Sequence, residues 1–440
     1  MSMARSLPSP ELALFHAALG LSSPWQVTKV QFDPSTPADK KLHLYLDFPA
    51  GSKFPCPDCG RACSVYDSDA DRVWRHLNFF EHQTFLHARF PRIHCDDCPV
   101  KPGVKTIEAT WARPGSGFTL LFEAYALLLC RQMPVRAAAA LLGEHDTRLW
   151  HLVGQHVEPA HANADWSAVR CVNVDETARR SGHNYVTLFA DAQTSTVLLV
   201  TDGKDSAAIS AFSQELQLKA HGGTPEQIKS FTMDTMDMSP AFESGVTHCF
   251  PQASQIVDRF HVMQIANRDV DKIRRSETRE CPVLKGTRFL WLKNPEHLTA
   301  PQKRTLEALC ASSPELRTVQ AYQQKMSLRQ LWEQGDKSQA TAYLTDWCQT
   351  SEGILPGVAA TVRKHATRIL NYFNFNFNGF MSGGQANAQA NAQANAQTNA
   401  LMEGINSLVQ ATKARARGYR SDRYLKWMIY LTTGNLATCR

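Results

Sequence analysis

The segment Cys171-Val-Asn-Val-Asp175 and the residues after it, as far as Met233, decide the fold class of this chain. Alternating and apolar runs predict strands at 171–174, 185–190, 196–201 and 229–233, and a helical pattern covers 206–218. A strand, a hairpin, a helix and a further strand in this order indicate an α/β domain. Asp175 directly follows the first strand, and Asp237 follows the last one after a short step.

Downstream of this domain the pattern is helical from about 262 to 372, which predicts a helical domain about a hundred residues long. A low-complexity tract follows, in which Gln385-Ala-Asn-Ala388 repeats through residue 400. A four-residue period is far below that of a solenoid, so the tract is no repeat fold. Its composition leaves a frayed helix and a disordered segment as equal alternatives.

Upstream, residues 117–157 carry three short helical patterns, with Gly143 as a stop before the last. This arrangement predicts a helix-turn-helix whose third helix places Arg148 near its N-terminus, where side chains read base edges in a major groove. A plain packing module of three helices is the alternative. Ahead of it, residues 11–19 predict a short helix and residues 41–48 alternate as a strand does.

Two Cys-x-x-Cys pairs, one at Cys56 and Cys59 and one at Cys95 and Cys98, stand between these regions. Each pair can present two thiolates to a tetrahedral Zn²⁺ ion from one tight knuckle, so the sequence predicts a structural zinc site. Cys63 and His94 lie close enough in sequence to replace one of the ligands. Basic and aromatic residues alternate between the knuckles, as in a strand-rich module that grips phosphates, although a solvated surface has the same pattern.

Composition sets outer limits on the function. The chain has 440 residues, 43% of them hydrophobic, and 47 Lys and Arg against 41 Asp and Glu give a net charge of +6. Disorder throughout is therefore excluded, whereas local basic patches for nucleic acid remain compatible with this charge. Twelve cysteines in so long a chain favour a metal site over a secreted disulfide scaffold. Without a signal peptide or an apolar run long enough to span a bilayer, a cytoplasmic protein with no membrane partner is expected.

Three carboxylates form the pattern with the most chemical content. Asp175 and Asp237 follow strands, and Glu403 lies in the helical segment 402–410. Converging carboxylate oxygens can hold two Mg²⁺ ions about 4 Å apart, an arrangement that serves in-line phosphoryl transfer. Spacing alone leaves Glu176 and Asp234 as alternatives.

A basic tail follows Glu403. Residues 412–426 contain several cations and a single acidic residue, Asp422. On a helix leaving Glu403, these cations would bring positive charge to phosphates beside the metals. A merely solvated basic helix is the alternative. The residues expected to bind DNA here are Lys413, Arg415, Arg417 and Arg420.

Several ordered motifs resemble the ISL3 family of bacterial insertion-sequence transposases, and the resemblance covers nearly the whole chain. They are Val174-Asp-Glu-Thr177, Thr235-Met-Asp-Met-Ser-Pro-Ala-Phe242, Ile256-Val-Asp-Arg-Phe-His-Val262, Asp271-Lys-Ile-Arg-Arg275, Thr398-Asn-Ala-Leu-Met-Glu-Gly-Ile-Asn406 and Arg415-Ala-Arg-Gly-Tyr-Arg420.

The resemblance implies an RNase H-like α/β catalytic core interrupted by an all-α insertion and preceded by the zinc-binding module and the helix-turn-helix. It maps a DDE triad onto Asp175, Asp237 and Glu403, with two Mg²⁺ ions per active site or Mn²⁺ in their place. Asp258 and His261 match an Asp-x-x-His signature with an accessory role near the scissile DNA, although Asp258 also fits a strand-end or helix-capping residue.

The activity that the resemblance implies is cleavage at terminal inverted repeats and strand transfer to target DNA. A homo-oligomer on DNA is expected, because two ends must be held together. Association with the nucleoid is expected as well. A zinc-dependent DNA-binding repressor, or a catalytically decayed transposase, is the alternative function. The tract before Glu403 departs from the family pattern and bears on activity, because a displaced carboxylate slows catalysis.

These inferences divide the chain into seven parts. They are an N-terminal region (1–52), a zinc-binding module (53–112), a helix-turn-helix (117–160), the first part of the catalytic core (168–262), a helical insertion (263–380), the low-complexity tract (381–400) and the C-terminal helices with the basic tail (401–440).

Overall fold

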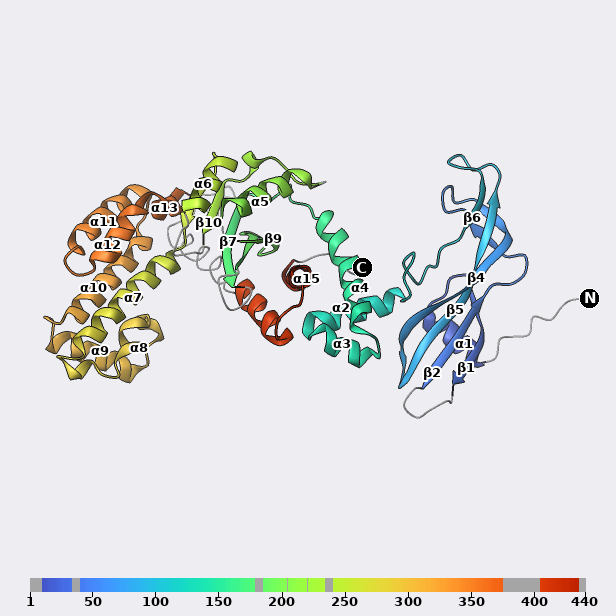
Figure 1. The fold of residues 1–440 in the computed structure, drawn as a ribbon, viewed down its shortest axis with the longest axis horizontal. Coiled ribbons are helices and arrows are strands. Elements are labelled where there is room, and N and C mark those ends of the chain that lie inside the picture. The colour runs from blue at the N-terminus through green and yellow to red at the C-terminus, as the bar shows by residue number, and fades with distance from the viewer. Residues whose placement is uncertain are drawn as a thin grey trace, which may run out of the picture. The chain divides into compact units, whose positions relative to one another are not determined.

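A computed structural model of the chain describes residues 10–33, 40–178, 185–203, 205–219, 221–233, 240–374 and 404–434. Asp237, Glu403 and the low-complexity tract lie outside the described residues. The chain divides into two compact units, one of Met1–Gln155 with Thr438–Arg440 and one of His156–Ala437 (Figure 1).

A six-stranded sheet forms most of the first unit, with the order β1-β2-β5-β4-β3 and β6 paired to β5. The elements are α1 (Pro10–Leu19), β1 (Gln26–Asp33), β2 (Lys41–Asp47), β3 (Lys53–Pro55), β4 (Ala62–Phe79), β5 (His82–Cys95) and β6 (Gly103–Thr106). Alternation in β2 turns Leu42, Leu44 and Leu46 inward, as the strand pattern predicted. They pack in one core with Trp25 and Trp74. Because β2 pairs with β5, the sheet runs from the N-terminal region into the cysteine-bearing segment.

Three helices complete the first unit, and their positions confirm the three helical patterns in the sequence. They are α2 (Leu120–Gln132), α3 (Val135–Leu142) and α4 (Asp146–Ala162). Thr119 caps α2 by accepting from the Phe122 amide, and Gly143 ends α3 in the left-handed region with φ 66°. The last helix, α4, continues past Gln155 into the second unit.

A five-stranded sheet organises the second unit, with the order β11-β10-β7-β8-β9. The strands are β7 (Cys171–Ala178), β8 (Tyr185–Asp191), β9 (Val197–Asp202), β10 (Ser230–Met233) and β11 (Ser254–Val257). The first three strands are antiparallel neighbours, whereas β10 runs parallel to both β7 and β11. Helix α5 (Ser206–Leu218) leads into β10 by way of the short η1 (Pro225–Gln227), and α6 (Pro240–Cys249) precedes β11.

The two faces of β7 have different partners. Val172 and Val174 pack in the hydrophobic core with Phe212 of α5, which contacts α6. Successive strand residues point to opposite faces, so Asn173, Asp175 and Thr177 lie on the other one. All are buried, and the second face is covered by the helix of residues 404–416.

After β11 the described chain is helical as far as Asn374, as the sequence pattern predicted, and these helices belong to the same compact unit as the sheet (Figure 1). Its elements are α7 (Arg259–Glu277), η2 (Pro282–Leu284), α8 (Arg288–Leu292), η3 (Pro295–His297), α9 (Ala300–Ser312), α10 (Arg317–Arg329), η4 (Gln330–Glu333), α11 (Lys337–Thr350), α12 (Pro356–Lys364), α13 (Ala366–Leu370) and η5 (Asn371–Asn374). Trp291 and Trp347 are almost completely buried in this block, in a core continuous with that of the sheet.

The described chain ends with two helices, residues 404–416 and α15 (Asp422–Thr433). Helix α15 packs on β9, and the Tyr430 hydroxyl accepts a hydrogen bond of 2.9 Å from the Val200 amide. The basic tail is therefore not one helix, because the chain turns between residues 417 and 421.

Candidate functional site

The structure brings the predicted four cysteines together. The Sγ atoms of Cys56, Cys59, Cys95 and Cys98 lie within 4.8 Å of one another, with 4.0 Å between Cys56 and Cys98 and 3.7 Å between Cys59 and Cys95. A tetrahedral zinc ion with Zn–S distances of about 2.3 Å holds its sulfur ligands about 3.8 Å apart. The four thiols therefore fit zinc in spacing as well as in chemistry.

Local structure around the first knuckle explains why these thiols converge. The Cys56 amide donates to the Arg61 carbonyl over 2.8 Å, and the Gly60 amide donates back to Cys56 over 2.9 Å. At the second knuckle, hydrogen bonds led by the Lys101 amide lower the pKa of Cys98 to about 6. Lys105 also donates to the Cys98 sulfur over 3.2 Å. Both effects favour the thiolate, the form that binds metal.

The two alternative ligands lie outside the cluster. The Cys63 thiol faces the carbonyl oxygen of Arg61 at 3.5 Å, and His94 Nδ1 lies 2.8 Å from an Asp96 carboxylate oxygen. In the part of the chain that the structure describes, the four-cysteine set is the one group with metal-ligand geometry.

Most cations between the knuckles are paired with acidic side chains. Arg72 pairs with Asp69 at 2.7 Å, Arg89 with Asp47 at 3.2 Å, and Arg92 with Asp67. The alternating basic pattern of this segment is thus largely neutralised within the sheet.

Arg75 also has an acidic partner, but unlike the other arginines of this segment it is buried, with its side chain only 1% exposed. Its guanidinium lies between the rings of Phe85 and Phe122, and it donates to the Leu142 carbonyl at the end of α3 over 3.1 Å. The Glu144 carboxylate lies 3.5 Å from its Nε. Arg75 therefore joins the cysteine-bearing sheet to the three helices, a role that its position in a basic run gave no sign of.

Helix α4 presents a polar stripe of the kind that reads DNA. Thr147, Arg148, His151 and Gln155 are exposed and line a cavity of about 360 Å³. Arg148 stacks on the Phe118 ring at 4.2 Å and pairs with Glu144, which fixes its orientation. His151 and Gln155, bonded to each other over 2.8 Å, extend the surface that the sequence assigned to Arg148 alone.

Asp175 lies where the parallel strands of the second sheet end. Val174 is opposite Met233, the last residue of β10, and Met233 is opposite Val257, the last residue of β11. Asp175 is therefore one position beyond this line on the central strand, and Asp258 is one position beyond it after β11. The carboxyl ends of such strands are where open α/β sheets bind ligands.

Asn406, on the helix of residues 404–416, holds the Asp175 carboxylate. Its side-chain amide donates to Asp175 Oδ2, while the Glu176 backbone amide donates to Oδ1 over 2.7 Å. One turn further on, the Gln410 amide donates to the Thr177 hydroxyl. Asn406 Oδ1 is buried and has no hydrogen-bond partner among the described residues, so within them an unsatisfied acceptor lies beside the carboxylate. Sequence reasoning missed Asn406, although the motif that ends at Asn406 contained the signal.

Asp258 has the helix-capping geometry that the sequence left open. Its side chain is 7% exposed and accepts from the Phe260 amide over 2.8 Å, which starts α7. His261 lies in the first turn of the same helix. In the middle of α7, the buried Asp271 is paired with Arg274, Arg275 and Arg288, so this motif stabilises the helical block.

The predicted DNA-binding cations of the tail occupy one helix and the turn after it. Lys413 and Arg415 are on the helix of residues 404–416, and Arg417 and Arg420 are in the turn. Lys413 donates to Gln410 over 3.2 Å and Arg415 to the Ala411 carbonyl over 3.3 Å.

A cysteine-lined metal site, a helix-turn-helix and an α/β sheet with a buried carboxylate at its ligand-binding edge define a DNA-binding enzyme. Three family profiles match these parts in the same order. The zinc-finger of the IS204/IS1001/IS1096/IS1165 transposases matches residues 52–98, the helix-turn-helix domain of transposase family ISL3 matches 107–157, and the DDE transposase domain of the same family matches 172–392. The chain therefore belongs to the ISL3 family of transposases.

Curated relatives agree with this family. The chain is 27% identical to the transposase for insertion sequence element IS1001 of Bordetella parapertussis over 414 residues, which are 91% of this chain and 94% of the relative. It is 25% identical to the transposase for insertion sequence element IS1557 of Mycobacterium tuberculosis, over 81% of this chain and 85% of that one. Among the described residues, no helix has the length and apolar character needed to cross a membrane.

Proposed function

We propose that this transposase cleaves DNA at the terminal inverted repeats of an insertion sequence and joins the ends to target DNA in a Mg²⁺-dependent reaction. Asp175, Asp237 and Glu403 form its catalytic triad. The observation that carries the proposal is the buried carboxylate of Asp175, held by Asn406 at the edge where the parallel strands end.

Sheet topology supports an RNase H-like core. The first three strands, β7, β8 and β9, are antiparallel neighbours, and β10 and β11 are added in parallel on the other side of β7. The resulting order is β9-β8-β7-β10-β11, with the candidate carboxylate on the central strand. The helices of residues 259–374 follow this sheet and precede the helix of residues 404–416, which returns to β7. They support an all-α insertion within the catalytic core.

Sequence distances from described elements support a triad that includes Asp237 and Glu403. Asp237 is four residues beyond Met233, where β10 ends, and Glu403 immediately precedes the described helix of residues 404–416. Glu403 is also three residues before Asn406, whose amide binds Asp175. Asp258 directly follows β11 at this edge, and His261 follows in the first turn of α7, which supports their accessory role.

The groups around Asp175 suit divalent ions that prefer oxygen ligands. Its carboxylate and the unsatisfied Asn406 Oδ1 are hard donors side by side in a buried setting. Mg²⁺ or Mn²⁺ held there by the triad would activate a water or 3′-hydroxyl and stabilise the leaving oxygen. The protein's own contribution is orientation, because the Asn406 and Glu176 amides fix both carboxylate oxygens of Asp175.

The first unit supplies end recognition in this proposal. Thr147, Arg148, His151 and Gln155 of α4 read base edges, and the zinc module holds the unit's sheet in shape. Lys413, Arg415, Arg417 and Arg420 bind phosphates of the strand beside Asp175. Two ends must be processed together, so the working form is a homo-oligomer on DNA.

The test is Mg²⁺-dependent nicking of duplex DNA that carries the element's ends. We expect cleavage at the ends in Mg²⁺, no cleavage with a chelator, and restoration by Mn²⁺. End binding without cleavage under all of these conditions would instead identify a DNA-binding repressor or a decayed transposase.

A further inference from the structure

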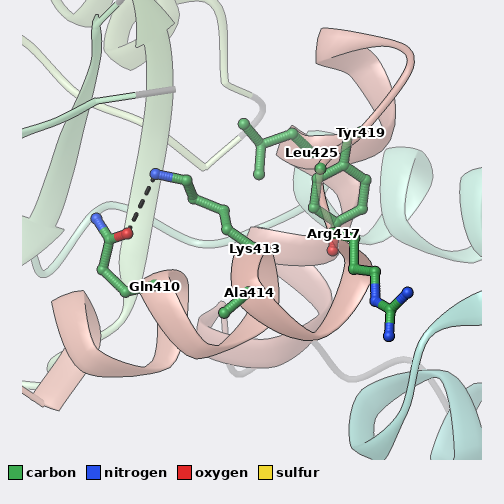
Figure 2. A pocket seen from close by; sticks show the side chains of 7 residues that line it. Gln410, Lys413, Ala414, Arg417, Tyr419 and Leu425 are labelled. Atoms are coloured by element: carbon green, nitrogen blue, oxygen red, sulfur yellow. Dashed lines mark hydrogen bonds between the residues drawn. The ribbon is translucent and has the colours of Figure 1, made fainter. Parts of the chain in front are cut away.

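A cavity lies at the far end of the helix of residues 404–416, on the side away from Asn406. It has a volume of about 360 Å³, in the lower range of ligand sites and far above the share of one water. Lys413, Arg417, Gly418, Tyr419 and Leu425 are among the residues that line it, and Figure 2 shows the two cations pointing away from each other, one at each end.

Arg417 has a backbone conformation that its side chain disfavours. Its φ is 53°, in the left-handed region that ends helices and is usually occupied by glycine or asparagine. A residue of this kind in that region costs stability. A glycine at position 417, like the Gly418 that follows with φ 99°, would adopt a left-handed conformation without strain. In the described part of the chain Arg417 forms no ion pair or side-chain hydrogen bond, so contacts with the described residues do not explain the arginine.

The cavity is connected to Asp175 along the same helix. Asn406 binds Asp175, Gln410 binds Thr177 and also accepts from Lys413 over 3.2 Å, and the cavity begins at Gln410 (Figure 2). Seven residues separate Asn406 from Lys413, or about 10 Å along the helix axis. This length corresponds to about three base-pair steps of duplex.

Both cations line the cavity, so each is available to bind a phosphate there. Lys413 and Arg417 are four residues apart, about 6 Å along the helix axis. Between them the cavity floor is formed by the ring of Tyr419, whose hydroxyl donates to the Thr412 carbonyl over 3.3 Å, and by Leu425. Partial burial lowers the pKa of Lys413, so a neighbouring anion would stabilise its charged form.

We propose that this cavity seats two backbone phosphates of the DNA strand on which Asp175 acts, one on Lys413 and one on Arg417. The inference rests on the proposed function and narrows its basic tail to a defined site. Two other cations of the tail contribute less here, because Arg423 is paired with Glu158 at 2.7 Å and Lys426 with Asp202 at 2.9 Å.

Salt-dependent DNA binding by the full-length protein tests the inference without any cleavage step. The probe is a fluorescent duplex of arbitrary sequence, and the Kd is measured over a NaCl series. Loss of one phosphate contact makes the slope of log K against log[salt] shallower by about 0.9 and weakens binding about eightfold at 0.1 M salt. We expect both effects for Arg417→Gly, Arg417→Asn and Lys413→Met.

Thermal unfolding of the same variants separates a phosphate contact from a structural role. Glycine and asparagine both tolerate φ 53°, so we expect Arg417→Gly and Arg417→Asn to melt at or above the wild-type Tm. Ser195→Gly is the matched control, because Ser195 has φ 58° in the turn between β8 and β9. This control should keep the wild-type Kd and salt slope.

Two results would overturn the inference. One is a wild-type Kd and salt slope for both Arg417 variants, and the other is a lowered Tm for both while Ser195→Gly melts normally. If the variants bind normally and the wild type still cleaves in Mg²⁺, this inference fails and the proposed function stands. If the variants lose binding as expected but the wild type never cleaves, the phosphate site stands and the proposed function fails.

Discussion

Replacing Arg75 with methionine should detach the three helices of the first unit from its sheet. The guanidinium makes hydrogen bonds to carbonyl groups of three segments, one of them the Leu142 carbonyl at 3.1 Å, and is paired with Glu144, whose side chain is 7% exposed. Methionine fills much of the same volume but donates nothing. Of the two ionic partners that Glu144 has among the described residues, Arg148 alone would remain.

The size of the effect follows from these contacts. Breaking a buried ion pair by removing one partner costs about 3–5 kcal/mol, because the remaining charge is left without compensation. In native-state hydrogen exchange this corresponds to opening that is roughly a hundredfold to a few thousandfold more frequent. The affected amides are those of α3 and the first turns of α4, measured by mass spectrometry on the full chain.

Arg72→Met is the matched control for this experiment. Arg72 lies on the same strand, but its side chain is 51% exposed and its pair with Asp69 is on the surface. Surface pairs contribute little, so exchange in α3 and α4 should be unchanged. Equal protection of these helices in Arg75→Met and Arg72→Met would refute the reasoning that Arg75 joins the two parts.

Three further predictions concern the zinc site, a buried histidine and the carboxylate's partner. Cys59→Ser should lose bound zinc by elemental analysis, whereas Cys63→Ser should retain it; equal zinc content in both would contradict the assigned ligand set. Burial, together with Arg75, lowers the pKa of His76 to about 4. The unfolded chain therefore takes up a proton first as the pH falls below about 6.5, and the free energy of unfolding should decrease by up to about 3 kcal/mol between pH 6.5 and 4. His76→Gln should flatten this part of the urea-denaturation profile, and an unchanged profile would exclude His76 as its source. Asn406→Ala should weaken Mn²⁺ affinity about tenfold to a hundredfold in a direct titration, and unaltered affinity in a folded variant would show that Asn406 does not support the metal site.

Local patterns in the sequence predicted the elements of the fold well. The helix expected at residues 206–218 has those bounds in the structure, and the three helical patterns of the helix-turn-helix each appear within a few residues. The paired Cys-x-x-Cys motifs predicted the four-cysteine cluster, because short knuckles impose ligand geometry locally. Features of the structure that depend on a short residue spacing or on a hydrophobic period can therefore be predicted from the sequence.

Features that depend on distant segments were beyond such reasoning. Arg75 belonged to a run of alternating basic residues that had the pattern of a DNA-facing surface, and its burial depends on Leu142 and Glu144, almost seventy residues away. The contact between Asn406 and Asp175 joins residues 231 positions apart. The break in the basic tail depends on Arg417 in a left-handed conformation, which only the adjacent Gly418 hinted at.

Asp175 lies within β7 and not after the strand as predicted, because the strand continues to Ala178, and its side chain is buried. Its catalytic role, like those of Asp237 and Glu403, is proposed from family membership and position. Asp258 caps the N-terminus of α7, so an accessory role in catalysis would be a second role of the same side chain.

Asp175→Asn is the most direct test of the central claim, because it keeps the size of the side chain and removes its charge. The variant and its control Asp202→Asn, an exposed carboxylate at the end of β9, are compared in Mg²⁺ for cleavage of end-containing DNA and for binding to the same DNA. The account predicts that Asp175→Asn binds the ends with wild-type affinity and leaves them uncut, while Asp202→Asn binds and cuts. Cleavage by Asp175→Asn at the wild-type rate would contradict it.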